Sequence, residues 1–327
     1  MTPSTRVFFR RGRRPGSSTT SMDRRHVARF ERAHVDVVYR SAALMVRDVH
    51  CSRFHPNSGP EEHSNGHTIV LVRSGLFTKT TGGETVLADP NHVLFFTRHQ
   101  PYHVTHPVLG GDRCTLLLLR PSDLLDVVRS YAPVDAERED APFPFTWALS
   151  TPRTFLLHHT LLARLRRAQT APLAVEDQVF HLVDDLMARA YELFRGQRNR
   201  GGVEAARRHR ALVEAAKLLI DQNVQHPPAL GELADALGCS SFHLSRIFHR
   251  EAGLPMRRYL DRCRLRTALE RLAEGERDLT GLALDLGYAD HSHFSNAFRR
   301  EFAMSPSLFR RRAGRALVRE ARKNLQA

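Results

Sequence analysis

The last third of the chain carries the same pattern twice, and this repeat limits which folds are available to it. One copy runs from Leu233 to Gly253 and the other from Leu282 to Ala303. Each copy has a short apolar stretch, a glycine turn and a longer basic stretch. Matching positions are Leu233 with Leu282, Ala234 with Ala283, Leu237 with Leu286, Gly238 with Gly287, Ser245 with Ser295, Phe248 with Phe298, Arg250 with Arg300 and Glu251 with Glu301. The pattern predicts two helix-turn-helix units.

The segment between the copies predicts one long helix. It begins with Pro255 at the first turn and ends before Gly275, a pairing typical of helix starts and stops. About 20 residues at ~1.5 Å each span ~30 Å, close to the roughly 34–36 Å of one turn of B-DNA. The spacer therefore predicts two units placed in successive major grooves, which together read an asymmetric sequence.

Charge is unevenly distributed along the 327 residues. The net charge is +14 in total, with +7 in residues 1–32, −1 in the middle and +8 in residues 205–327. A near-neutral middle between basic ends favours a sensing or assembly domain joined to a part that binds a polyanion. We predict that residues 1–28 form a disordered basic arm and that 313–327 form a basic tail.

Neither a membrane nor a disulfide framework is predicted. No apolar run approaches the roughly 20 residues that span a bilayer. The four cysteines, Cys51, Cys114, Cys239 and Cys263, form no CxxC pair, which indicates a reducing cytoplasm.

Residues 29–135 are predicted to form a β-barrel or jelly roll. Gly, Pro and Asn punctuate short segments rich in Val, Leu, Phe and Thr, an arrangement that favours an all-β barrel able to enclose a small molecule. The predicted strands are Val35–Tyr39, His67–Val72, Leu76–Thr80, Thr85–Leu87, His92–Phe96, Tyr102–Thr105 and Cys114–Leu119.

Helices are predicted beyond Pro121. One is capped by Ser122 or Asp123 and runs through Ser130, and a proline-punctuated connection covers 132–152. Within the predicted unit 136–200, amphipathic segments at 154–168 and 175–194 form an antiparallel pair. Their apolar stripe is either a dimer seam or a surface packed on the barrel. Residues 196–202 are predicted to be a linker, followed by a helix over 205–223.

The second half of the chain resembles the AraC/XylS family of transcriptional regulators over 205–312. The resemblance rests on Leu233-Ala234, Gly238, Leu244-Ser245-Arg246, Phe248 and Gly253, then on Gly287-Tyr288, Phe294, Phe298, Phe302 and Ser305-Pro306. Ala303 stands where a glycine is usual and Phe309 where a tyrosine is usual, while His249 and Asn296 stand where Lys and Arg are frequent. The resemblance implies a multidomain α+β protein, with a cupin-like N-terminal sensor and an all-α double helix-turn-helix domain.

Helical spacing and the resemblance indicate the same DNA-contacting face. Ser240 and Asp290 are predicted caps of the two basic helices, with Leu244, Ile247, Phe248, Phe294, Ala297 and Phe298 in the core. Predicted base contacts are Phe242, Ser245, Arg246, His291, Ser292, His293 and Asn296. Predicted phosphate contacts are Arg250, Arg299, Arg300 and Arg310. Arg264 is a candidate for an ion pair that fixes the long helix.

The predicted function is that of a sequence-specific DNA-binding transcription regulator, not an enzyme, with a small-molecule sensor. Expected partners are double-stranded promoter or operator DNA, a small-molecule effector, RNA polymerase and a second copy of the chain. No cofactor and no metal ligands are assigned, because the histidines of the sensor lack an H-x-H pair followed by Glu. Two rival hypotheses remain: a cupin-type metalloenzyme fused to a DNA-binding unit, and a non-specific architectural DNA-binding protein.

Overall fold

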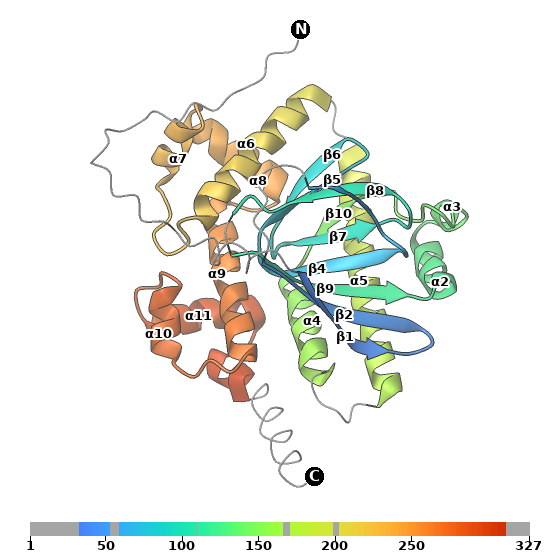
Figure 1. Cartoon of the computed structure of the whole chain (residues 1–327). Coiled ribbons are helices and arrows are strands. Elements are labelled where there is room, and N and C mark those ends of the chain that lie inside the picture. Colours follow the sequence, from blue (N-terminus) through green and yellow to red (C-terminus); the bar gives the residue numbers. More distant parts are fainter. Residues whose placement is uncertain (1–32, 53–58, 109, 166–170, 199–202, 312–327) are drawn as a thin grey trace, which may run out of the picture.

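A computed structural model describes residues 33–52, 59–108, 110–165, 171–198 and 203–311 (Figure 1). The predicted arm at 1–28, the predicted tail at 313–327 and positions 199–202 of the predicted linker lie outside the described residues. Within the described part, two β-sheets precede a helical half, so the predicted α+β fold class is confirmed.

The N-terminal half is built from two antiparallel sheets that face each other. The larger has the strand order β1-β2-β9-β4-β7-β10 and the smaller β3-β8-β5-β6. The strands are β1 (Ala33–Arg40), β2 (Leu44–Cys51), β3 (Glu61–His63), β4 (Thr68–Gly75), β5 (Phe77–Thr81), β6 (Glu84–Ala88), β7 (His92–Phe96), β8 (Pro101–Thr105), β9 (Asp112–Leu119) and β10 (Trp147–Leu149). All seven predicted strands are present in the described chain.

Three further strands, β2, β3 and β10, are absent from the sequence prediction. Strand β2 carries Arg47, Asp48 and His50, which break the apolar pattern expected of a buried strand. Its Asp48 is bound by the buried Arg73 of β4, a contact between segments distant in sequence. Strands β3 and β10 have three residues each, too few to show a period.

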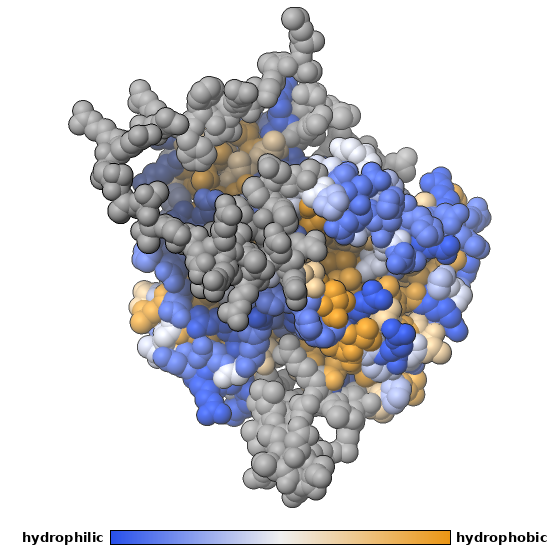
Figure 2. All heavy atoms as spheres, viewed as in Figure 1, coloured by the Kyte–Doolittle hydropathy of each residue, from blue (hydrophilic) through white to orange (hydrophobic). Residues whose placement is uncertain are grey.

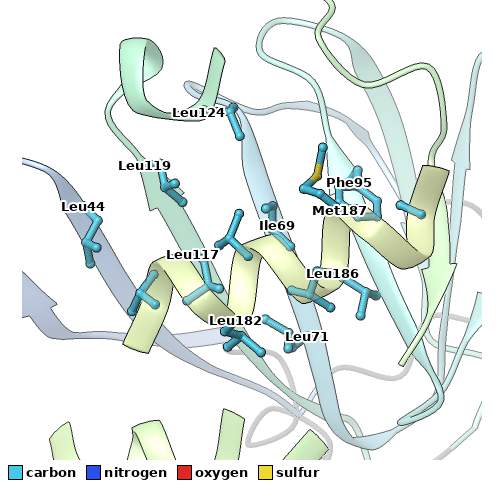
Figure 3. Packing of buried hydrophobic residues seen from close by; sticks show 14 of the residues in the cluster. Leu44, Ile69, Leu71, Phe95, Leu117, Leu119, Leu124, Leu182, Leu186 and Met187 are labelled. Carbon is cyan, nitrogen blue, oxygen red and sulfur yellow. The ribbon is translucent and has the colours of Figure 1, made fainter. Parts of the chain in front are cut away.

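The larger sheet separates a partly open cavity from a layer of helices. Successive side chains of a strand point to opposite faces, so Leu116 and Leu118 of β9 line the cavity while Leu117 and Leu119 join the core on the other face. Helix α5 (Pro172–Arg198) lies across that second face, with Leu182, Leu186 and Met187 packed against Ile69, Leu71, Phe95 and Leu117 (Figure 3). Of the two predicted roles for this apolar stripe, packing against the barrel is the one observed.

Some predicted boundaries of the connecting helices are wrong. Helix α2 (Pro121–Tyr131) begins with a proline and follows Arg120, because proline is well suited to a first helical position; neither Ser122 nor Asp123 is the cap. The segment predicted as a connection contains α3 (Pro133–Ala136) and β10. Helix α4 (Pro152–Leu165) packs on α5, which continues through the first residues of the predicted linker.

The helical half consists of two units around separate cores. In the first, α6 (Val203–Asp221), α7 (Leu230–Ala236) and α8 (Ser241–Ala252) enclose Leu244, Ile247 and Phe248. In the second, α10 (Leu279–Asp285) and α11 (His291–Phe302) enclose Phe294, Ala297 and Phe298. Helix α9 (Met256–Ala273) joins the units and lies beside the barrel (Figure 1). Its 18 residues span about 27 Å. No helix of the described residues is both long and apolar enough to cross a membrane.

Arg264 of α9 forms hydrogen bonds rather than the predicted ion pair. Its guanidinium donates to the backbone oxygens of Val224 and Gln225 at 2.7–3.0 Å. Gly287 leaves the room for this contact, since a Cβ at that position would come within 2.6 Å of Arg264 Nη2. Arg264 therefore ties the connection after α6 to the glycine turn of the second unit.

The final residues of α8 and α11 allow a reciprocal stability test. Gly253 and Ala303 both end their helices in the left-handed region, at φ 72° and 55°. An L side chain is strained there, by roughly 1 kcal/mol. We expect Ala303→Gly to raise the free energy of unfolding by about 0.5–1 kcal/mol and Gly253→Ala to lower it by about 1 kcal/mol, as measured in urea. A loss of stability in Ala303→Gly would contradict the strain at this position.

Candidate nucleic-acid interface and effector cavity

Helix α8 exposes one polar face while its other face is fixed in the core of the first unit. The Ser240 side chain caps the helix by accepting a hydrogen bond from the His243 backbone N–H at 3.2 Å, as predicted. Leu244, Ile247 and Phe248 are fully buried. The predicted base contacts Phe242, Ser245 and Arg246 are exposed, and the Phe242 ring is 78% exposed although it is apolar. An aromatic side chain held in water by a rigid helix is available to a ligand.

Helix α11 has the same design with different exposed residues. Asp290 caps it by accepting from the His293 backbone N–H at 2.7 Å, which confirms the predicted cap. Ser292, His293 and Asn296 are exposed. His291 is half-buried, with Nε2 3.3 Å from the Ser295 hydroxyl. Among equivalent exposed positions, Phe242 matches Ser292 and Arg246 matches Asn296.

The predicted phosphate contacts differ in what else they bind. Arg299 and Arg300 are exposed at the end of α11. Arg250 instead lies against Glu251 at 2.9 Å and contacts His209 of α6. Arg310 is half-buried and donates to the backbone oxygen of Arg277. Arg250 and Arg310 would have to give up contacts within the chain to bind a phosphate fully.

A buried polar network holds α6 and α9 against the barrel. Asp89, between β6 and β7, accepts from the Tyr259 hydroxyl at 2.7 Å and lies 3.5 Å from Lys217 Nζ. Burial alone would raise the pKa of Asp89, but neighbouring His92 and Lys217 hold this pKa well below its usual range. Arg266 of α9 is fully buried and donates to Ser150 O at 2.8 Å and to Pro90 O.

A second group of ion pairs joins α9 to strands β4 and β9. Glu270 is buried, 3.3 Å from Arg73 and 3.4 Å from His159 of α4. One helical turn further, Glu274 forms an ion pair with Arg113 of β9. Sequence reasoning missed these residues because isolated charges on a strand or helix usually indicate a solvated face.

The cavity of about 530 Å³ lies on the inner face of the larger sheet. Figure 2 shows hydrophobic side chains over β2 and β9, surrounded by hydrophilic ones. Aromatic side chains line the cavity together with a few polar groups: Phe77, Phe96, Tyr102, Arg47, His63 and His106. Three other histidines of this half, the buried His67 and His92 and the more exposed His103, do not line the cavity and make contacts elsewhere.

One end of the cavity brings together three side chains that the sequence did not connect. The ligand atoms of Cys51, His106 and Asp112 lie within 4.8 Å of one another, and all three residues are buried. His106 Nε2 is 2.8 Å from Asp112 Oδ1. Burial alone would lower the pKa of His106, but hydrogen bonds to Asp112 and Cys51 raise it to about 9. The imidazole is therefore a cation paired with Asp112 at neutral pH.

Comparison with known proteins gives one match within the helical half and others that cover about three quarters of the chain. A family model described as a helix-turn-helix domain matches residues 233–312. The HTH-type transcriptional activator RhaS of Enterobacter sp. (strain 638) is 24% identical over 248 residues, covering 76% of this chain and 86% of the relative. RhaS of Citrobacter koseri is 24% identical over 258 residues, covering 78% and 88%.

Two solved structures are also similar. An AraC-type DNA-binding regulator from Chromobacterium violaceum covers 32% of this chain and 92% of its own, at 24% identity and a TM-score of 0.30. ToxT from Vibrio cholerae covers 85% and 97%, at 12% identity and a TM-score of 0.32. The repeated helix-turn-helix geometry and the family match agree that residues 233–312 form a helix-turn-helix domain, and over about three quarters of its length the chain is similar to HTH-type transcriptional activators.

Proposed function

We propose that α8 and α11 read two different half-sites in successive major grooves of promoter DNA. The observation that carries this proposal is the pair of capped helices with matched cores and unlike exposed faces. Phe242 offers an apolar contact for a thymine methyl, Ser245 a hydrogen bond, and Arg246 a bidentate contact to guanine. On α11, Asn296 suits adenine, with His291, Ser292 and His293 beside it. A length of about 27 Å for α9 supports a spacing near one turn of DNA.

Phosphate binding is proposed for the arginines at the ends of the same helices. Arg299 and Arg300 are exposed one turn beyond Asn296, which suits contacts to the DNA backbone. Arg250 and Arg310 are weaker members of this set, because their guanidinium groups already have partners in the chain. Such contacts add affinity without reading sequence.

The cavity is proposed to bind a small-molecule effector whose presence is transmitted to DNA through β9. Asp112 and Cys114 line the cavity, while the intervening Arg113 lies on the other face and forms an ion pair with Glu274 of α9. A shift of this strand on ligand binding would therefore change the ion pairs that hold α9. This geometry supports a sensor domain around 29–135 and a DNA-binding domain around 205–312.

The protein is further proposed to act in the cytoplasm as a homodimer that contacts RNA polymerase. The contacts that hold α6, α9 and α4 on the barrel favour regulation over catalysis as the use of the first domain. The architectural rival, a binder that ignores sequence, predicts that every exposed contact matters equally on all DNA.

Arg246→Ala and Asn296→Ala test base reading. Preferred DNA would first be selected from a random duplex library with the full chain. We expect each variant to weaken binding to that DNA by about 10–100-fold, corresponding to about 1–3 kcal/mol, with little change on random DNA. Each variant should relax preference in a different half of the site, as measured by gel shift on single-base variants. An equal loss on every DNA sequence would favour the architectural rival.

Arg299→Ala tests the phosphate role. Removing one phosphate contact should weaken binding to all duplexes alike and reduce the slope of log affinity against log salt by about 1. Arg271→Ala is the matched control, since Glu276 and Asp285 already bind its guanidinium at 3.0 Å. A loss confined to the preferred sequence would show that Arg299 contacts bases instead.

Glu270→Gln tests whether the ion pairs on α9 hold the two halves together. This substitution removes the buried carboxylate that Arg73 and His159 contact. It should therefore lower the free energy of unfolding by about 3 kcal/mol. Glu274→Gln, one turn away and half-exposed, should cost less than about 1 kcal/mol. Denaturant unfolding at constant salt measures both. Equal small effects would mean that the proposed coupling does not depend on Glu270.

A further inference from the structure

One end of the cavity presents a thiol, an imidazole and a carboxylate to the same point. Cys51 ends β2, His106 follows β8, and Asp112 begins β9, so three separate segments converge there. All three side chains are buried, at 5–7% exposure, and all line the cavity. Their ligand atoms are within 4.8 Å of one another. This combination of a soft thiolate, a borderline imidazole and a hard carboxylate oxygen occurs in sites for zinc and similar divalent ions.

Two glycines bring the three segments together. Gly111 has φ 68°, and a Cβ there would lie 1.8 Å from the backbone oxygen of Cys51. Gly75 has φ 81°, and its Cβ would lie 2.0 Å from the backbone oxygen of Gly111. The loop before β9 can therefore rest directly on the end of β2 and on the end of β4. As a result Asp112 is paired in register with both Cys51 and Gly75.

We propose that Cys51, His106 and Asp112 form a binding site for a Zn²⁺-class divalent metal ion inside the sensor cavity. Ligands about 2.0–2.3 Å from a tetrahedral zinc ion are roughly 3.5 Å apart, so the pairwise distances need only small changes. The hydrogen bond between His106 and Asp112, now 2.8 Å, opens as the ion enters between them. Binding of the ion displaces one proton from the His106 imidazolium and one from the Cys51 thiol to solvent. The resulting thiolate and the carboxylate neutralise the two charges of the ion, which removes the main cost of burying it.

The site leaves a coordination position for another group. Three protein ligands and one open position are the arrangement of zinc sites that also bind water or a small molecule. Cys114 lies nearby, with Sγ 3.2 Å from Asp112 Oδ2, but it does not belong to the group of side chains whose ligand atoms all lie within 4.8 Å of one another. Cys114 therefore contacts a ligand without being one. This proposal is independent of DNA reading, since it concerns only the barrel.

Metal titration of the full chain without DNA tests the proposal. The reduced, metal-free protein would be titrated with Co²⁺ and then Zn²⁺, with thiolate-to-cobalt absorption and equilibrium dialysis as readouts. We expect one ion per chain with a cobalt–thiolate band that Zn²⁺ abolishes. Cys51→Ser should remove the band and weaken Zn²⁺ binding more than about 100-fold, since loss of mere supporting contacts costs about 10–100-fold. The matched control is Cys114→Ser, which removes another buried thiol of the same cavity. This variant should retain both the cobalt–thiolate band and the affinity for Zn²⁺.

A second measurement separates lost binding from lost folding. Zn²⁺ should raise the thermal unfolding midpoint of the wild-type chain and of Cys114→Ser, but not of Cys51→Ser or Asp112→Asn, whose circular dichroism should match the wild type. The absence of a cobalt–thiolate band in the wild type would overturn the proposal, as would a band that survives Cys51→Ser. In the first case His106 and Asp112 form only a structural ion pair, and in the second the thiolate ligand is another cysteine.

Discussion

The strict alternation of side chains in the larger sheet is the constraint on which the rest of the structure depends. Alternate residues of β2 and β9, with Thr68 and Val70 of β4, line the cavity, whereas residues between them such as Val46, Ile69 and Leu117 join the core that packs on α5. Strand β9 shows this most directly, since Asp112 and Cys114 line the cavity and Arg113 reaches Glu274. A shift of this strand by one register position would exchange these two sets. The sheet is therefore both the wall of the sensor and the surface to which the DNA-binding half is attached.

The two helix-turn-helix units use one backbone plan with two different surfaces. Caps at Ser240 and Asp290 and the buried positions Phe248 and Phe298 are equivalent, so the helices begin and pack in the same way. The exposed positions are not equivalent in chemistry, as Arg246 and Asn296 illustrate. Because one helix, α9, joins them, the two units are proposed to act as a single reader with unlike halves.

The parts of the structure predicted correctly from sequence are those determined by local patterns. Caps, glycine turns and apolar spacing of three or four residues fix where α8, α9 and α11 lie and which residues face outward. The parts missed depend on contacts between distant segments. Strand β2 is stabilised by the pairing of Asp48 with Arg73, and the cluster at the end of the cavity depends on the close approach of Gly111 to Cys51. The spacing of residues within one segment cannot indicate such a contact with a distant segment. The burial of the Glu270 carboxylate could not be predicted from the sequence for the same reason.

The central claim is that one chain reads two unlike half-sites about one turn of DNA apart. Chemical footprinting at base resolution, on sites selected by the full chain, tests it most directly. The account predicts protection of two different short motifs in successive major grooves on one face of the duplex, about 10 base pairs apart. Dimeric protein would protect two copies of this same asymmetric arrangement. Identical or mirror-related motifs within one chain's footprint, or uniform protection regardless of sequence, would contradict it.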